Sequence, residues 1–195
     1  MTRIKPALDS PAALALALLC LVPLAIGSPA AQSDDDAIAT ALMAAPPALA
    51  GSAMVIRLDD AGEYEVLREG DNDLVCWDRS DQPNMSFSVQ CTSVGNLPRI
   101  QQNRAWAMSG QSAEEIRALQ DAAEADGTRE VSVYGSMYYT VAGADADSAG
   151  LHMTIAVPFA TGESLGLPEE GSYTRAGTWV MQAGTSAAHI MLPGR

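Results

Sequence analysis

Apolar and polar residues alternate with two different periods along this chain, and the period divides it into segments. A period of two predicts a half-buried strand, whereas apolar residues three or four positions apart predict a helix. The two-residue period predicts strands at 54–58, 63–68, 74–77, 85–91, 131–141, 151–157, 178–182 and 187–192. The helical period predicts helices at 37–45, 97–108 and 113–125. Two central helices between two groups of strands predict one small α+β domain with a mainly antiparallel sheet.

The third helix has the clearest boundaries. Ser112 followed by Glu115 forms a capping box, in which each side chain accepts a hydrogen bond from the other residue's backbone amide. Gly127 follows the helix, where a residue with positive φ commonly ends it. Residues 159–176 contain several Gly and Glu, and we expect a long loop there. The chain thus divides into a signal peptide at 1–30, an N-terminal helix and linker at 31–52, and a single domain at 53–195.

The N-terminus has the order of a cleavable secretory signal peptide. Arg3 and Lys5 form a short basic segment, 11–27 is almost wholly apolar, and the small residues Ser28 and Ala30 follow. We expect cleavage after Ala30, because small residues then occupy both positions that require them. A retained membrane anchor is the alternative, but this apolar run is short for a spanning helix. We therefore expect a periplasmic or extracellular protein with no membrane anchor after cleavage.

Removal of this segment makes an acidic chain slightly more acidic. The whole sequence has a formal net charge of −13, from 11 basic and 24 acidic residues. Residues 1–30 hold two basic residues and one acidic residue, so the mature chain keeps 9 and 23, a net charge of −14. Lys5 is the only lysine, so every mature cation is an arginine. Such a chain is repelled by nucleic acid and by anionic lipids, and we expect neither as a partner.

Export also changes the cysteine count. Cys20 leaves with the signal peptide, and Cys76 and Cys91 remain. An even pair in an exported protein predicts a disulfide, which stabilises by about 3 kcal/mol for a loop of about 15 residues. A pair of buried thiols and a metal site are the alternatives, although no histidine lies near either cysteine in sequence.

Several diffuse motifs resemble a family of uncharacterised exported bacterial proteins. They are Leu67-Arg-Glu-Gly70 before Cys76, the segment 112–118, Gly150-x-His152-Met153, and Trp179-Val-Met-x-x-Gly184-Thr-x-x-Ala188-His189-Ile-Met-x-Pro193. The resemblance covers roughly 37–193. It implies export and a single domain, and it implies no activity.

The two histidines are the clearest candidates for binding. His152 and His189 are the only histidines, and both fall on predicted strands whose same-face neighbours are mostly small or polar. Tyr138 lies on a similar polar face. If these strands are neighbours, Tyr138, His152 and His189 line a shared pocket. Two separate histidines with ordinary hydrogen bonds are the alternative.

A hydrolase is the second interpretation. Gly162-Glu-Ser164-Leu-Gly166 matches the nucleophile-elbow pattern, with His189 as the downstream base. That mechanism needs a helix after the serine and an Asp between the serine and the histidine. Pro168 interrupts such a helix, and no Asp lies between Ser164 and His189. The pattern therefore favours a glycine-rich surface loop.

Copper binding is the third interpretation. His152, Met181, His189 and Met191 are imidazole and thioether donors, which select Cu(I), and they resemble the histidine and methionine motif of periplasmic copper chaperones. The spacing departs from that motif, and methionine is also a common core residue.

The sequence contains no phosphate loop, zinc spacing or dinucleotide fingerprint, so we expect no cofactor. It favours a non-catalytic accessory domain that binds an unidentified ligand or protein partner.

Overall fold

The computed structural model describes residues 33–172, 174 and 177–192. The expected signal peptide and its cleavage site lie outside the described residues. The helices are α1 (Asp34–Ala41), α2 (Pro47–Ala50), α3 (Leu97–Ala107), α4 (Ala113–Asp126) and α5 (Gly162–Leu165), with short 3-10 turns η1 (Leu42–Ala44) and η2 (Val94–Asn96). The strands are β1 (Met54–Leu58), β2 (Tyr64–Arg68), β3 (Leu74–Asp78), β4 (Phe87–Ser93), β5 (Met137–Gly143), β6 (Gly150–Ala156), β7 (Trp179–Met181) and β8 (His189–Leu192).

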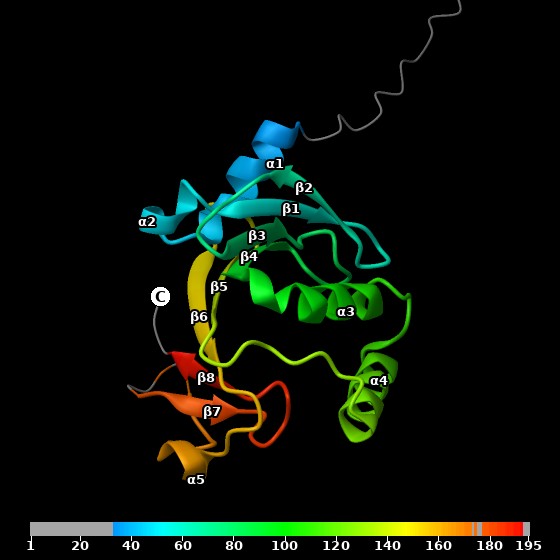
Figure 1. Ribbon diagram of the computed structural model, residues 1–195, viewed down its shortest axis with the longest axis vertical. Coiled ribbons are helices and arrows are strands. Elements are labelled where there is room, and N and C mark those ends of the chain that lie inside the picture. The colour runs from blue at the N-terminus through cyan, green and yellow to red at the C-terminus, as the bar shows by residue number, and fades with distance from the viewer. Residues whose placement is uncertain (1–32, 173, 175–176, 193–195) are drawn as a thin grey trace, which may run out of the picture. The chain divides into compact units, whose positions relative to one another are not determined.

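All the described strands belong to one sheet with the order β2-β1-β3-β4-β5-β6-β8-β7. Strands β1 and β3 are parallel, and every other neighbouring pair is antiparallel. Figure 1 shows the sheet curving from β1 and β2 through β5 and β6 to β7, with α3 and α4 on the side toward which it curves. The α+β fold with a mainly antiparallel sheet is confirmed.

The parallel pair requires the chain to cross the start of β1 between β2 and β3. Gly70 lies at this crossing, where a Cβ atom would come within 2.2 Å of the Met54 amide nitrogen. The next amide, that of Asp71, donates to the Ser52 carbonyl at 2.9 Å. Glycine therefore lets the two backbones approach closely enough to hydrogen-bond.

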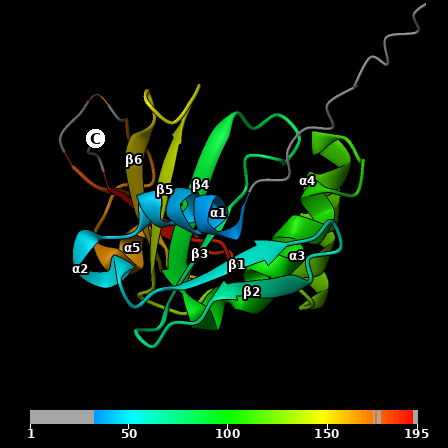
Figure 2. The same ribbon diagram turned by 90° about the horizontal axis from the view of Figure 1, so that it is seen from above.

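One face of the sheet packs against α1 and η1. Ala41 and Ala44 contact an apolar cluster that includes Val55, Val89 and the two cysteines. The small alanine side chains let the helical segment lie close to the strands. The N-terminal helix is thus part of the core of the compact unit Gln32–Arg195, and Figure 2 shows α1 lying across the strands.

The opposite face packs against α3, but only over β1 and β3. Leu97 and Ile100 contact the apolar side chains of Ile56, Val75 and Trp77. All of these residues are buried, and each such side chain stabilises the fold by about 1.5–3 kcal/mol.

Arg104 fixes the other end of α3 to the β1–β2 hairpin. Its side chain is 3% exposed and donates to both carboxylate oxygens of Asp81, at 2.6 and 2.7 Å, and to the Asp59 carbonyl at 2.9 Å. The Arg104 guanidinium lowers the pKa of Asp81 below its ordinary value. Helix α3 is therefore held at one end by apolar contacts and at the other by a charged network.

The expected disulfide between Cys76 and Cys91 is confirmed. The two residues are directly opposite each other on β3 and β4, with their Cα atoms 4.1 Å apart. Both are fully buried beneath α1 and η1. The bridge therefore joins the middle of the two strands within the core.

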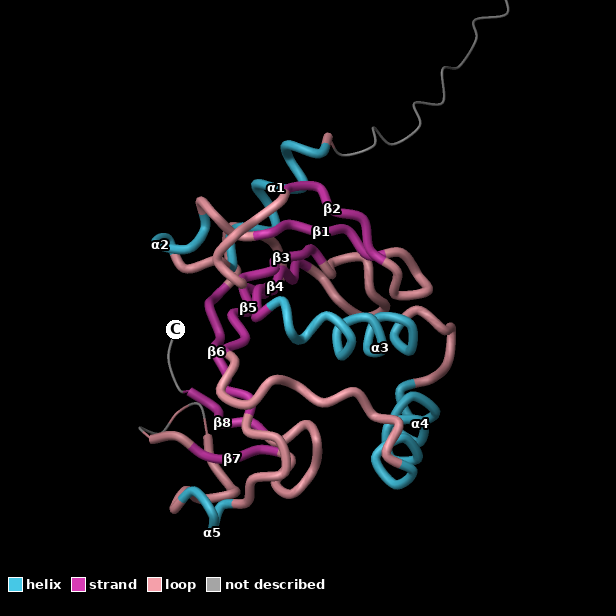
Figure 3. Tube along the Cα trace, viewed as in Figure 1, coloured by secondary structure: helices cyan, strands magenta, loops and turns pink. Residues whose placement is uncertain are grey.

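The strand expected at 131–141 is wrong over its first half. Strand β5 begins at Met137, and Figure 3 shows the segment between α4 and β5 as loop. The Val133 amide donates to the side-chain oxygen of the buried Asn96, and the Asn96 amide group donates to Thr92 and Ser136. The Asn96 side chain accepts the backbone hydrogen bond that a neighbouring strand would otherwise accept. The alternating residues at the start of this segment therefore do not form a strand.

Two other expectations need smaller corrections. The linker contains a single helical turn, α2, and the long loop contains another, α5. Each is only four residues long, too short for a 3.6-residue period to be visible in the sequence. The capping box of Ser112 and Glu115 and the positive φ of Gly127 are confirmed at the ends of α4.

We predict that reduction of Cys76–Cys91 lowers the free energy of unfolding by about 3 kcal/mol, because the reduced unfolded chain gains conformational freedom. Denaturant unfolding with and without a thiol reductant measures this difference. The double variant Cys76→Ala/Cys91→Ala is the control, and its stability should not respond to reductant. Equal stability of the reduced and oxidised wild-type protein would contradict the prediction.

Candidate functional site

The polar half of the α3-facing side of the sheet forms a concave site of about 510 Å³. We call it the sheet-face site. Its floor consists of Gln90, Tyr138, Thr140, His152, Thr154, Ala156 and His189. Its walls consist of Arg79, Arg99, Asn103, Ser132, Gln182, Ala187 and Ala188.

Strand register explains why the floor is continuous. Thr140 on β5 is paired with Gln90 on β4 and with His152 on β6. Tyr138 is paired with Thr154 in the same way. Paired residues of neighbouring strands point to the same face. Strands β4, β5 and β6 therefore place these polar side chains side by side on the face that α3 leaves uncovered.

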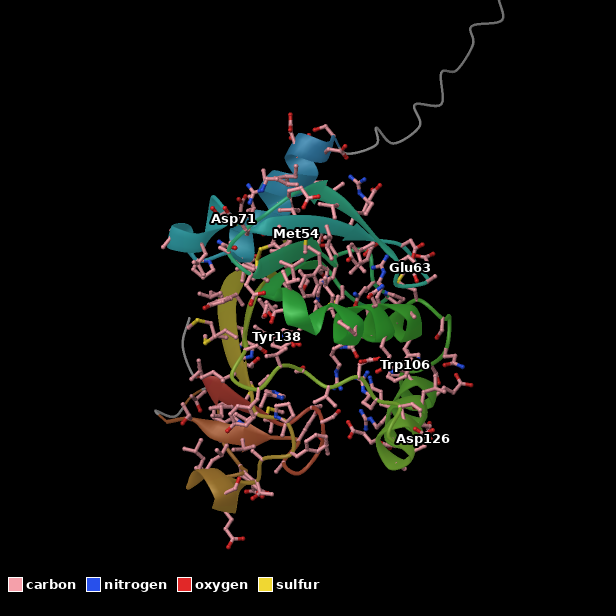
Figure 4. All side chains as sticks on the ribbon, viewed as in Figure 1. Met54, Glu63, Asp71, Trp106, Asp126 and Tyr138 are labelled. Carbon is pink, nitrogen blue, oxygen red and sulfur yellow. A yellow bond between two sulfur atoms is a disulfide. The ribbon has the colours of Figure 1, made fainter. Side chains whose placement is uncertain are left out.

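The three residues expected to bind a ligand line this one site. Tyr138, His152 and His189 come from β5, β6 and β8, which are consecutive in the sheet. Figure 4 shows Tyr138 on the inner side of the curved sheet, between β5 and α3. The structure therefore brings together residues that lie up to 51 positions apart in the sequence.

Burial favours the neutral forms of Tyr138 and His152. Tyr138 hydrogen-bonds Ser132 at 3.0 Å, and burial raises the pKa of its phenol. Burial, with a smaller effect of the charge on His189, lowers the pKa of His152. Nδ1 of His189 lies 2.8 Å from the Ala187 carbonyl and donates to it, which leaves Nε2 for other partners.

Arg79 and Arg99 are site residues that the sequence alone does not reveal. Arg99 lies in the first turn of α3, where a positive charge opposes the helix dipole, and this is the one sequence signal that marks it. Arg79 directly follows β3, and nothing in the sequence pattern distinguishes it from a surface arginine.

Ser164 does not join His189. It lies inside the single turn α5, and its hydroxyl donates to the Thr161 carbonyl and accepts from the Thr161 amide, both at 2.9 Å. Ser164 is not among the described residues that line the site with His189. A nucleophile elbow places the serine at a strand-to-helix turn, whereas here β6 ends five residues before α5 begins. The geometry gives the hydrolase interpretation no support.

The methionines of the copper interpretation share a sheet face with the histidines but do not line the site. Met181 is paired with His189, and Met191 is paired with Trp179. Met191 is buried, Met181 is exposed on the edge strand, and neither lines the sheet-face site. Across the described part of the chain, no group of three or more His, Cys, Asp or Glu is placed to hold a metal ion.

A search for similar proteins found no match among family models, curated proteins or solved structures. Among the helices that the structure describes, none is long and apolar enough to cross a membrane.

We predict that Arg79→Met leaves the free energy of unfolding within about 1 kcal/mol of wild type. The substitution loses one hydrogen bond to Gln90, but it also removes a buried Nε that has no acceptor among the described residues. Arg104→Met is the matched control and should cost about 2–4 kcal/mol, because it breaks a satisfied buried network.

Denaturant unfolding of both variants makes the comparison. If Arg79→Met is as damaging as Arg104→Met, Arg79 has a structural role and is not a site residue.

Proposed function

We propose that this protein is an exported, non-catalytic binding domain that holds a small molecule in the sheet-face site. The observation that carries the proposal is the convergence of Tyr138, His152 and His189 on one concave, polar site. Small-molecule sites are typically preformed concave sites of 300–1,000 Å³ with a few convergent polar groups. The sheet-face site, at about 510 Å³, has this size, and its lining is mostly polar.

The rigid surroundings of the site favour binding of a ligand without large rearrangement. The floor is made of consecutive paired strands, and the Asn96 side chain ties the loop before β5 to β4. Groups held on strands keep their geometry better than groups on free loops.

The chemistry of the site favours binding over catalysis. A histidine that acts as a general base is commonly oriented by a carboxylate. No Asp or Glu is among the described residues that line the sheet-face site, and His189 is oriented by a backbone carbonyl. These features support recognition of a ligand by hydrogen bonds.

Export is supported by the order of basic, apolar and small residues in 1–30 and by the buried Cys76–Cys91 disulfide. The resemblance to exported bacterial proteins fits the same proposal.

We predict that the secreted or periplasmic form begins at Ala31, because Ser28 and Ala30 then occupy the positions before the cut. Intact mass spectrometry of the protein from a bacterial expression host checks this. Ala30→Arg is the informative variant and should leave uncleaved precursor, whereas Gln32→Arg, beyond the cut, should not. A mature chain that still contains 1–30 would contradict the prediction.

We predict that Thr154→Phe abolishes small-molecule binding, because the larger side chain fills the site. The matched control is Met153→Phe, the neighbouring position on β6 whose side chain points to the opposite face. Thermal unfolding is measured with glycerol, succinamide, spermidine and succinate at ~10 mM, since a ligand at 100 times its Kd stabilises by about 2.7 kcal/mol. At least one probe should stabilise wild type and Met153→Phe but not Thr154→Phe. No stabilisation of wild type by any probe would contradict the proposed function.

A further inference from the structure

The charges around the sheet-face site are opposite to those of the chain as a whole. The sequence holds 24 acidic residues, and none of those described lines the site. Arg79, Arg99 and both histidines line it. The polar site of this acidic protein is therefore lined by two arginines and two histidines, and no described carboxylate lines it.

Two other arginines, Arg57 and Arg104, have carboxylate partners, whereas Arg68 donates to the backbone carbonyls of Ala50 and Ala53. Arg57 contacts Asp34 and Glu65, and Arg104 contacts Asp81 and Asp60. Carboxylates are therefore abundant enough to pair with arginines elsewhere. Among the residues that the structure describes, no carboxylate lies within ion-pair distance of Arg79 or Arg99.

Arg99 is held in place by neutral groups. Its Nη1 donates to the Ser186 hydroxyl at 2.8 Å and to the Glu130 carbonyl, and the residue is 6% exposed. Within the described chain, Nε and Nη2 have no hydrogen-bond acceptor. Burial lowers the pKa of Arg99, and the charges of Tyr138, Glu124 and Glu130 offset this effect only in part. Hydrogen bonds from Nη1 thus orient the Arg99 guanidinium, and Nε and Nη2 can donate to a bound anion.

Arg79 is the second arginine that lines the sheet-face site. Its Nη1 donates to Gln90 at 3.2 Å, and the Gln90 amide donates to Thr140 at 2.7 Å. Its Nη2 has only the Met85 sulfur, at 3.9 Å, and its buried Nε has no acceptor in the described chain. A half-buried guanidinium whose buried Nε lacks an acceptor favours an anion as its partner.

Arg129 adds positive charge behind Arg99. It donates to Gln102 and Asn103, and its guanidinium lies 4.5 Å from the centre of the Trp106 ring. Burial, together with the positive charge of Arg99, lowers the pKa of Arg129 to about 10. The acidic side chain of Glu124 accepts from the Ser186 amide and hydroxyl.

The neighbouring cavity, between α3, α4 and the β7–β8 turn, is less suited to an anion. It measures about 550 Å³ and is lined by three arginines and two carboxylates: Arg99, Arg117, Arg129, Asp121 and Glu124. The two carboxylates offset part of the positive charge there. The sheet-face site has the same Arg99 without them.

Resting on the proposed function, we propose that the ligand of the sheet-face site is a small organic anion. Its carboxylate or phosphate group binds Arg79 and Arg99, and its polar remainder contacts Tyr138, Thr140 and His152. Guanidinium groups suit both kinds of anionic group, because their planar donors match two oxygens at once.

The histidines make this binding depend on pH. His152 and His189 face Arg79 from the β3–β4 connection, Arg99 from α3 and Tyr138 from β5, with no carboxylate among the described lining residues. A bound anion favours the protonated imidazole, so anion affinity rises as pH falls. Because burial lowers the pKa of His152 in the free protein, its share of this rise is complete only below the ordinary histidine value of about 6.5.

The test uses two pairs of probes that match in shape and differ in charge: succinate with succinamide, and glycerol 3-phosphate with glycerol. Isothermal titration of the mature protein at pH 7 should show binding of succinate or glycerol 3-phosphate and at least tenfold weaker binding of its neutral counterpart. Preference between the two anions distinguishes a carboxylate from a phosphate ligand.

The variants locate the anion. Arg99→Gln and Arg79→Gln should each weaken anion binding at least tenfold, with circular dichroism confirming that each variant is folded. Arg57→Gln removes the same charge outside the site and should change affinity less than twofold. Lowering the pH from 7.5 to 5.5 should strengthen binding to wild type, and His152→Gln/His189→Gln should abolish that gain.

The outcomes separate this inference from the proposed function. If a neutral probe binds as tightly as its charged counterpart, the ligand is not an anion. The same conclusion follows if Thr154→Phe blocks binding but neither arginine variant weakens it. In both cases the proposed binding function stands. Failure of every charged and neutral probe to bind overturns both.

Discussion

The packing of α3 against β1 and β3 is the interaction on which the rest of the structure depends. Leu97 and Ile100 bury themselves against Ile56, Val75 and Trp77, and this contact sets the height of the helix above the sheet. Hydrogen bonds from Arg104 to Asp81 then fix the C-terminal end of α3. With both ends fixed, α3 presents Arg99 and Asn103 beside the strands that it does not cover. The apolar packing thus positions the polar wall of the site.

The uncovered half of that sheet face follows from its composition. Hydroxyl and imidazole groups are costly to bury without hydrogen-bond partners, so an apolar helix surface does not pack over them. The side chains that carry these groups are Tyr138, Thr140, His152 and Thr154. The other face of β5 is apolar, and its Tyr139 and Val141 pack against the cluster that contains the disulfide. Strand β5 therefore contributes to the core on one face and to a concave polar surface on the other.

Five of the arginines divide into two groups, which the net charge of the chain does not distinguish. Arg57 and Arg104 have carboxylate partners and belong to the scaffold. Arg79, Arg99 and Arg129 are held by amides, a hydroxyl, carbonyl oxygens and a ring. Buried cations without a counter-charge lower the stability of a protein that has no ligand bound. Residues that lower stability in this way are commonly retained where they contribute to function. Because long-range fields are screened within about 8 Å at physiological salt, a local cationic site is compatible with a strongly acidic surface.

The sequence by itself determined the fold class, most of the helices and strands, and the disulfide pair, because periodicity, capping and cysteine count are local signals. It was wrong at 131–136, where the distant Asn96 side chain takes a backbone hydrogen bond that local alternation assigns to a strand. It also identified Tyr138, His152 and His189 as candidates, since their neighbours two positions away are mostly small or polar. Only the tertiary structure decided that these three line one site and that Arg79 and Arg99 join them, because strand order and the position of α3 depend on contacts between residues far apart in the chain.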